Sequence, residues 1–535
     1  MKAPNFPRVY NVYALCAFAT VGGMLFGFDI SSMSGVIGTR GYTNYFGVSG
    51  GGYKQGGITS AMAWGSLCGS LGASWLADHL SRVTTLQISA VCWIIGSIFM
   101  CAANGLALLI IGRIVCGLGI GMASTVVPIY QAEVAPKDIR GGIISLQQWA
   151  ITWGIMIQYF IQYGCSFIDG GPHNPNQGTA PFRIPWGIQI VPGAIFLAGL
   201  LFFPKSPRWL AAHDRWEETM LVLSRLHGKG DRNDPKVLAE YKEIEDAMNL
   251  ERQLAKATWF DLAVPRNLKR VTLGMGLQMW SQLSGMNVMM YYIVYIMQSI
   301  DIGSPLLTSA IQYILNVVMT LPAILYIDKM GRRPTILAGF VMMAIWLFLV
   351  GGLQGGYGES YHSTDPDDPL SAITWIIPKN HKKAGKAIIA CSYLFVCSYA
   401  TTIGPTSWAY PAEIFPLHIR AKAVSLATAT NWTWNALLGL FVPPILRSIN
   451  WKMYLIFAAF NAVAFCHMFM CCFETKGFTL EEMDDIFQSG KWPWQKIDVH
   501  SRLDELKAKV EAGEAKITVP NVSEKGAETE AVEHV

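Results

Sequence analysis

Long apolar runs separated by short polar stretches dominate the chain from about residue 10 to residue 473. Twelve of these runs reach the ~20 mostly apolar residues that a helix needs to cross the hydrocarbon core of a bilayer. Many contain glycine or proline, which membrane helices tolerate where neighbouring helices satisfy the freed backbone groups. The predicted helices cover about residues 10–37, 56–77, 84–103, 106–128, 141–164, 184–204, 270–298, 306–328, 334–353, 385–411, 421–447 and 450–473.

The placement of lysine and arginine predicts the orientation of these helices. The connections after the even-numbered runs are basic, for example at Arg82, Arg140 and Arg332. Because cytoplasmic loops are enriched in Lys and Arg, we expect these connections and both termini to face the cytoplasm. A lysine cluster within residues 382–386 is predicted on the outer side, which is contrary to this rule. The other loops agree with the rule, so the predicted orientation stands.

Two copies of one phrase indicate that the chain is duplicated. YQAEVAPKDIR occupies residues 130–140 and YPAEIFPLHIR occupies residues 410–420, so both fit Y-x-A-E-x-x-P-x-x-I-R in identical register. A second repeat, DHLSR from residue 78 and DKMGRR from residue 328, precedes each copy of the phrase. We predict an all-α membrane protein with twelve helices in two pseudo-symmetric six-helix halves. Such parallel repeats place a substrate site between the halves, near the middle of the membrane.

Polar segments divide the chain into four predicted parts. The halves cover residues 1–204 and 269–473. Between them, residues 205–268 have the pattern of amphipathic cytoplasmic helices. Residues 474–535 form a cytoplasmic tail with one short helix, and its distal part, rich in Lys, Glu, Ala and Val, is predicted to be disordered.

Composition agrees with a membrane protein and excludes several functions. Hydrophobic residues make up 52% of the 535 residues and charged residues 15%, against about 25% in soluble domains. The net charge of +4 is too small to indicate nucleic-acid binding. Metal-ligand spacing, a phosphate-binding lysine loop and a nucleophile elbow are all missing, so we expect no metal, no cofactor and no enzyme activity. The lipid bilayer is the expected surrounding, and the chain is expected to function as a monomer.

Several motifs together resemble the sugar porter family of the major facilitator superfamily, over about residues 10–485. They are FGFD at 26–29, GRIVCGLGIG at 112–121, the first repeated phrase with the two glycines that follow it, PKSPRWL at 204–210, QLSGMNVMMYY at 282–292, DKMGRR at 328–333, GPTSWAYPAEIFP at 404–416, NWTWN at 431–435 and ETKG at 474–477. The amino-acid sequences of these motifs are similar to those of fungal members. The resemblance therefore implies a fungal-type monosaccharide transporter in the plasma membrane that works by alternating access.

Four positions depart from the family pattern. SRV at 81–83 replaces a glycine-initiated basic turn, Lys205 replaces a glutamate, and Phe473 replaces a proline. These three positions concern the cytoplasmic face. Ser281 stands before Gln282 where two glutamines are usual, which removes one expected sugar contact and leaves the identity of the sugar open.

Asp29 is a carboxylate inside a predicted membrane helix, a placement that costs ~2.5–3.5 kcal/mol on insertion scales and is usually functional. Arg113, in the fourth helix of the same half, is the expected cation beside it, and the resemblance implies that the two residues couple transport to a proton. The carboxylate would hold a proton more or less tightly depending on whether the arginine is near. A purely structural ion pair between the first and fourth helices is the alternative reading.

Amide side chains suit a sugar because they donate and accept hydrogen bonds without net charge. By resemblance, five amides on apolar helices and one tryptophan line the sugar cleft: Gln148, Gln282, Asn287, Asn316, Asn431 and Trp408. On a straight helix the side chains of Gln282 and Asn287 point in directions that differ by ~140°. A break at Ser284-Gly285 would let both reach one ligand. For Gln147 and Asn435 a hydrogen bond between helices is the simpler reading.

The repeated phrases lie at the predicted cytoplasmic ends of the fourth and tenth helices. Their charged residues, with those of the 78 and 328 repeats, are predicted to form salt bridges that hold the halves together on the inner side: Asp78, Arg82, Glu133, Arg140, Asp328, Arg332, Arg333, Glu413 and Arg420. At a membrane surface each pair is expected to contribute little alone. On the outer side, the resemblance implies that Tyr291 and Tyr292 form a gate.

The predicted function is import of a monosaccharide, a hexose such as glucose or a pentose such as xylose, by proton symport. Three alternatives stay open: a proton-independent uniporter, a sugar sensor, and a permease for a polyol or for quinate. Sensors of this family carry long cytoplasmic tails, and the tail here covers only positions 474–535.

Overall fold

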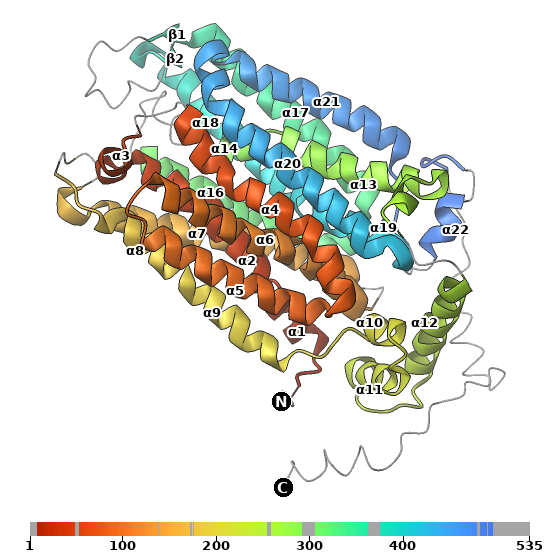
Figure 1. Ribbon diagram of the computed structural model, residues 1–535. Helices are drawn as coiled ribbons and strands as arrows, with labels where there is room; N and C mark the ends of the chain where they lie inside the picture. Colours follow the sequence, from red (N-terminus) through yellow and green to blue (C-terminus); the bar gives the residue numbers. More distant parts are fainter. Residues whose placement is uncertain are drawn as a thin grey trace.

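The computed structural model describes residues 8–48, 53–136, 139–171, 174, 176–253, 258–291, 305–361, 375–478, 482–488 and 491–495. Long helices run side by side and form one bundle (Figure 1). The first half contains α1 (Val12–Ala19) continued by α2 (Val21–Ser34), then α4 (Tyr53–His79), α5 (Arg82–Cys101), α6 (Leu106–Val134), α7 (Arg140–Ser166), and α8 (Ala180–Ile188) continued by α9 (Ile190–Gly199). A short α3 (Arg40–Phe46) follows α2.

The second half repeats this arrangement. It contains α13 (Pro265–Leu283) with α14 (Met286–Tyr291), α16 (Pro305–Met330), α17 (Arg332–Tyr357), α18 (Lys382–Thr401) continued by α19 (Ile403–Ile414), α20 (Leu417–Ile449) and α21 (Lys452–Cys471). Two-residue strands β1 (Glu359–Ser360) and β2 (Trp375–Ile376) pair antiparallel. The predicted class, an all-helical fold of two six-helix halves, is confirmed. The seventh predicted helix extends past Tyr291, and that part lies outside the described residues.

Eight helical stretches in the described chain are by themselves long and apolar enough to span a membrane. The remaining long helices carry more amide, hydroxyl and glycine residues, many of them buried inside the bundle. These helices are α4, α7, α13 with α14, and α20. At the junction of the halves, α4 packs along α20 and α7 packs along α16. The lower hydropathy of these helices therefore reflects a position facing protein instead of lipid.

Small residues let α4 and α6 approach closely. A Cβ atom on Gly69 would lie 2.2 Å from the carbonyl oxygen of Leu118, whereas a Cβ on Gly72 would meet no atom within 4 Å. We therefore expect Gly69→Ala to lower the stability of the purified protein by about 1–3 kcal/mol through overpacking. Gly72→Ala, on the same helix, is the matched control and should be neutral or slightly stabilising. Thermal unfolding in detergent compares the two; equal melting temperatures would contradict the predicted close packing.

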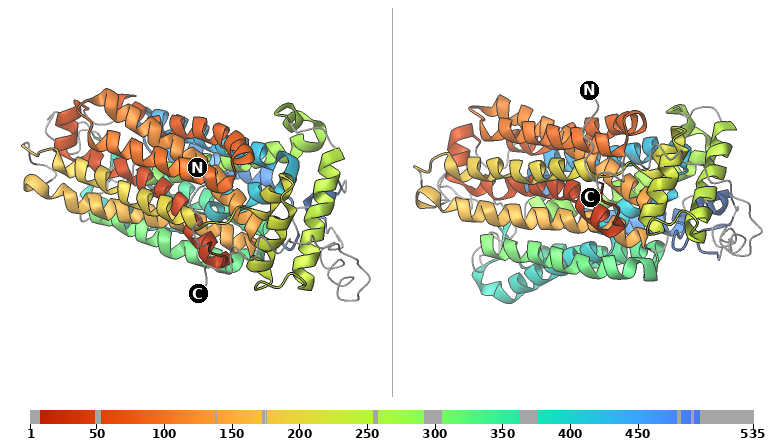
Figure 2. Two further views of the ribbon diagram at one scale, coloured as in Figure 1. Left: turned by 60° about the horizontal axis from the view of Figure 1, so that its bottom comes forward. Right: turned by 90° about the horizontal axis from the view of Figure 1, so that it is seen from below.

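The linker contains α10 (Pro207–Ala212), α11 (Trp216–His227) and α12 (Pro235–Gln253), and the tail contains α22 (Met483–Gln488). The three linker helices lie together at one end of the bundle, and α12 runs crosswise to the long helices (Figure 2). His227 joins this group to the membrane helices. Its Nδ1 lies 2.5 Å from Oε2 of Glu240 on α12, and its Nε2 lies 3.0 Å from the carbonyl oxygen of Val134 at the end of α6.

The His227 contacts predict a pH dependence of linker docking. Burial alone would lower the pKa of His227, but the Glu240 carboxylate and the two hydrogen bonds outweigh it and raise that pKa above 6.5. A raised pKa means that the contribution to stability is complete below about pH 6.5 and is lost as the pH rises through the folded value. We expect hydrogen exchange in α11 and α12 to accelerate as the pH rises above 6.5, beyond the intrinsic rate increase. In His227→Gln this pH dependence should disappear; if it persists, another group is responsible.

Candidate functional site

A small cavity lies between the two halves and is lined by residues of both. Its volume is about 40 Å³, room for about three water molecules. All five predicted amides and the predicted tryptophan line it: Gln148, Gln282, Asn287, Asn316, Asn431 and Trp408. A monosaccharide can enter only if the lining side chains move apart. Their assignment as sugar ligands stays a prediction.

Amides of the second half form a connected chain at this cavity. Gln282 Nε2 donates to Asn431 Oδ1 at 3.0 Å, and Asn431 Nδ2 donates to Gln278 Oε1 at 2.7 Å. Gln278 in turn donates to the carbonyl oxygen of Ser407 at 2.8 Å. Sequence reasoning missed Gln278, although its position one helical turn before Gln282 places both on one face of α13. The chain fixes the orientation of each amide and so presents a defined set of donors and acceptors.

The predicted helix break is present. α13 ends at Leu283, α14 begins at Met286, and Gly285 between them has φ +93°, a left-handed conformation that glycine adopts without strain. The break brings the Asn287 side chain to Gln282, to which its Nδ2 donates a hydrogen bond. The two amides therefore face one cavity, as the sequence required for a shared ligand.

Trp408 connects the second half to the first. Its indole Nε1 donates to Gln148 Oε1 at 3.2 Å, and the Phe26 ring meets it edge-on with ring centroids 6.4 Å apart. Asn316 lines the same cavity, and its Oδ1 is buried without a hydrogen-bond partner among the described residues. A buried acceptor of this kind costs free energy unless a ligand donates to it, which suits a sugar hydroxyl.

Of the two helix–helix hydrogen bonds predicted for Asn435 and Gln147, the structure contains only the first among the described residues. Asn435 Nδ2 donates to Gln282 Oε1 at 3.4 Å, which confirms that reading. Gln147 is fully buried against Gly23 of α2, and neither polar atom of its amide has a partner among the described residues. The predicted helix–helix hydrogen bond of Gln147 is therefore wrong for the described chain, because the close approach of α2 and α7 leaves no acceptor or donor within reach.

Gln148 and Gln147 provide a matched test of the cavity. Gln148 lines it and Gln147 does not, although they are neighbours on α7. We expect Gln148→Ala to raise the apparent KM for sugar about three- to tenfold, the effect of losing one hydrogen bond worth about 0.5–1.5 kcal/mol. Gln147→Ala should leave KM within about twofold. Initial uptake rates, corrected for the amount of protein at the cell surface, give the KM of each variant. Equal KM values in both variants would contradict the assignment of Gln148 to the sugar site.

Asp29 and Arg113 form a buried pair, as the motifs predicted. Arg113 Nη2 lies 3.5 Å from Asp29 Oδ2, and both side chains are almost fully buried. Ser32 lies between them: its hydroxyl proton is shared between the backbone carbonyl oxygen of Asp29 at 2.7 Å and Asp29 Oδ1 at 3.1 Å, and its oxygen accepts from Arg113 Nη1 at 3.2 Å. Arg113 also donates to the carbonyl oxygen of Thr59 at 3.4 Å. The carboxylate is therefore held by one long ion pair and one hydroxyl, a loose arrangement for a buried charge.

Charged residues at the cytoplasmic ends pair in the same way in both halves. Arg82 binds Glu133 with its two nitrogens at 3.0 and 3.1 Å and Asp78 at 3.3 Å. Arg332, at the equivalent position, binds Glu413 at 2.8 and 3.1 Å and Asp328 at 2.8 Å. The two sequence repeats thus supply an equivalent aspartate, arginine and glutamate to the network of each half.

Two features of this predicted network need correction. The central pairs are buried and not at the surface: Arg332 and Glu413 side chains are 3% and 6% exposed. They also lie within one half each, because each arginine binds a glutamate of its own repeat. Between the halves, Asp328 accepts from the backbone N–H of Gly142 at 2.8 Å, Asp78 lies 4.0 Å from Lys422, and the charges of Arg140 and Glu413 attract each other.

The remaining predicted members lie beside these networks. Arg420 donates to the carbonyl oxygen of Phe415 at 3.1 Å, and Arg333 donates to that of Phe469 at 3.0 Å. Arg140 is buried at the first residue of α7. The predicted outer gate cannot be placed, because Tyr292 and the side chain of Tyr291 lie outside the described residues.

Comparison with known proteins gives a family and close relatives. The model of the "Sugar (and other) transporter" family matches residues 15–487. The chain is 66% identical to the MFS glucose transporter mfs1 of Aspergillus flavus over 96% of both chains, and 43% identical to a high-affinity glucose transporter of Kluyveromyces lactis over 94% of this chain and 90% of that protein. The solved proton:xylose symporter XylE with 6-bromo-6-deoxy-D-glucose has the same fold, with a TM-score of 0.75 and 24% identity over 89% of this chain and 99% of that one. The chain therefore belongs to the sugar transporter family of the major facilitator superfamily, whose members are multi-pass membrane transporters and not enzymes.

Proposed function

We propose that the protein imports glucose, or a closely related monosaccharide, across the plasma membrane by proton symport. The observation that carries this proposal is the cavity between the halves, where five amides and one tryptophan converge. The buried Asp29–Arg113 pair lies in the first half, and its aspartate belongs to α2, the helix that also supplies Phe26 and Ile30 to the cavity. Oriented amides match the hydroxyls of an uncharged sugar, and an indole face packs well against its C–H surface. The glucose transporters among the relatives favour glucose over xylose as the substrate.

Transport would proceed by alternating access. Residues 1–204 and 269–473 would rock around the cavity, with residues 205–268 and 474–535 on the cytoplasmic side. Both halves of one chain line the cavity, and in this proposal a monomer completes the cycle. The salt-bridge networks would keep each half rigid, and the contacts of Asp328 and Asp78 would close the inner side while the cavity opens outward.

Proton symport and uniport differ in the role of Asp29. In symport its carboxylate takes up a proton outside, when the hold of Arg113 loosens, and gives it up inside. In uniport the pair would only join α2 to α6. The long 3.5 Å separation and the single bridging hydroxyl favour symport, because a purely structural buried pair needs close geometry to offset desolvation.

Sugar uptake in cells that lack hexose transporters, with external pH recorded, tests the proposal. Symport predicts that glucose makes the medium more alkaline and that a protonophore stops accumulation. Uptake that ignores the protonophore would establish the uniporter instead. Absence of glucose uptake, with uptake of quinate or a polyol, would point to the other permeases, and absence of all uptake would favour a sensor.

A further inference from the structure

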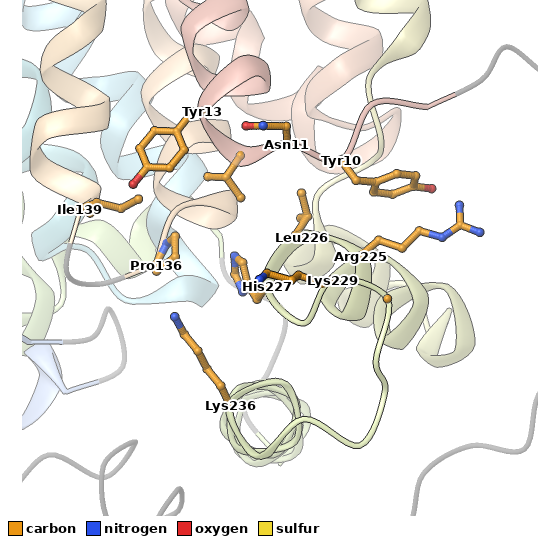
Figure 3. A pocket seen from close by; sticks show the side chains of 12 residues that line it. Tyr10, Asn11, Tyr13, Pro136, Ile139, Arg225, Leu226, His227, Lys229 and Lys236 are labelled. Carbon is orange, nitrogen blue, oxygen red and sulfur yellow. The ribbon is translucent and has the colours of Figure 1, made fainter.

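A second, larger pocket lies on the cytoplasmic side, away from the cavity between the halves. It is open to solvent, has a volume of about 870 Å³, and lies between the start of α1, the loop from α6 to α7, and the linker helices α11 and α12 (Figure 3). This volume is within the range of about 300–1,000 Å³ that is common for small-molecule sites.

The charge of this pocket is positive. Arg225, Lys229 and Lys236 line it, and no Asp or Glu is among its lining residues in the described chain. The ion pairs formed within the described residues include neither lysine. Lys236 extends from α12 toward Pro136 on the opposite wall (Figure 3). Cations that converge on open space from several segments are what an anionic ligand requires.

His227 lines the same pocket but does not change its net charge. Both ring nitrogens face acceptors, Glu240 Oε2 and the carbonyl oxygen of Val134, so the protonated ring donates from both. Its positive charge is balanced by the Glu240 carboxylate. The charge that meets a ligand therefore comes chiefly from the two lysines, Lys229 and Lys236.

Aromatic and amide groups complete the walls. The Tyr10 ring stacks under the Arg225 guanidinium, whose carbon lies 4.9 Å from the ring centroid, and Tyr13 is largely exposed at the rim. Asn11 uses its Oδ1 to cap α1 at Ala14, 3.1 Å away. An organic ring that carries phosphate groups could therefore pack on the aromatic surface while its phosphates meet the lysines.

We propose that this pocket binds a small phosphate ester, either the headgroup of a phosphorylated inositol lipid in the inner leaflet or a soluble phosphorylated sugar. Basic pockets at the cytoplasmic side of membrane helices recognise this chemistry. Pro136 and Ile139, which belong to the first repeated phrase, line the pocket together with α1 and the linker. An occupant therefore joins the linker helices to the first half, and slows transport by opposing movement of the linker when the inner side opens. Only this effect on transport rests on the proposed function; the binding itself does not.

The test uses the full-length protein in phosphatidylcholine vesicles. Calorimetry with D-myo-inositol 1,4,5-trisphosphate and with glucose 6-phosphate probes the soluble source. Protein reconstituted with phosphatidylinositol 4,5-bisphosphate, assayed by its melting temperature and counterflow rate, probes the lipid source. Binding of a soluble probe assigns the site to phosphate esters in general. A response to the lipid alone assigns it to the headgroup in the membrane.

The variant Lys229→Gln with Lys236→Gln should weaken binding about 25-fold, since each lysine near an anionic headgroup contributes about fivefold. Lys242→Gln with Lys269→Gln removes the same charge from residues outside the pocket and should bind like the unmodified protein. Failure of all three probes to bind, or equal binding by the two double variants, would overturn the proposal. Glucose uptake by both double variants in the absence of probe shows that folding and transport are intact.

Discussion

Asp29→Asn is expected to abolish sugar accumulation while leaving sugar exchange across the membrane. A membrane potential supplies ~2.3 kcal/mol per 100 mV for one proton and a pH gradient ~1.4 kcal/mol per unit, which together support two to three decades of accumulation. Asparagine keeps the shape of the side chain but cannot carry a proton. The accumulation ratio should therefore fall from the order of 100 to about 1, and glucose should no longer alkalinise the medium.

Counterflow separates this result from a loss of folding. Exchange of labelled for unlabelled sugar needs the alternating cycle but no net proton movement, so its rate should stay within a few-fold of the original. Ser32→Ala is the matched control for the local structure, because it removes the hydroxyl that bridges Asp29 and Arg113 and keeps the carboxylate. It should still accumulate sugar. Concentrative uptake by Asp29→Asn would show that the pair is structural and that the protein uses another proton site.

Most of the membrane helices could be predicted from the sequence because they depend on a local property, a run of apolar residues of sufficient length. The break between α13 and α14 was also visible, since Ser284-Gly285 is a weak point inside a run whose polar residues would otherwise face different sides. The Asp29–Arg113 pair could be inferred because charge inside such runs is rare, so that two opposite charges in one half are natural partners.

Properties that depend on how the helices pack could not be predicted in this way. Gln278 looks like an ordinary polar residue until Asn431 and Ser407 are placed beside it. The burial of the Arg332–Glu413 pair arises because the tail folds back over it: Thr475 Oγ1 donates to Glu413 at 2.6 Å.

The contacts between the halves, by contrast, could have been predicted from the sequence. Gly142 meets Asp328, and Lys422 meets Asp78. Gly142 and Lys422 stand at the same place after their copies of the repeated phrase, which end at Arg140 and Arg420. The duplication therefore places one partner for each aspartate at equivalent positions of the two halves, and a symmetric pair of contacts follows from it.

Arg332→Gln is expected to be the most destabilising single change in the cytoplasmic networks. It leaves the Glu413 carboxylate buried without its cation, a situation that typically costs about 3–5 kcal/mol. It also removes a partner of Asp328 and so loosens the residue that reaches across to Gly142. We expect a lower melting temperature, less protein at the cell surface, and faster modification of single cysteines placed on the cytoplasmic side of the cavity.

Arg333→Gln is the matched control, because it removes the same charge from the next residue. The Arg333 guanidinium donates to a backbone carbonyl, that of Phe469, at an exposed position, and no carboxylate is left buried when it is removed. Its effect should stay below about 1 kcal/mol. Glu413→Gln together with Arg332→Gln should recover part of the stability lost in Arg332→Gln alone, since the unpaired charge is then gone. If the double variant is no more stable than Arg332→Gln, the arginine acts through Asp328 and the contact between the halves, and not through the buried pair.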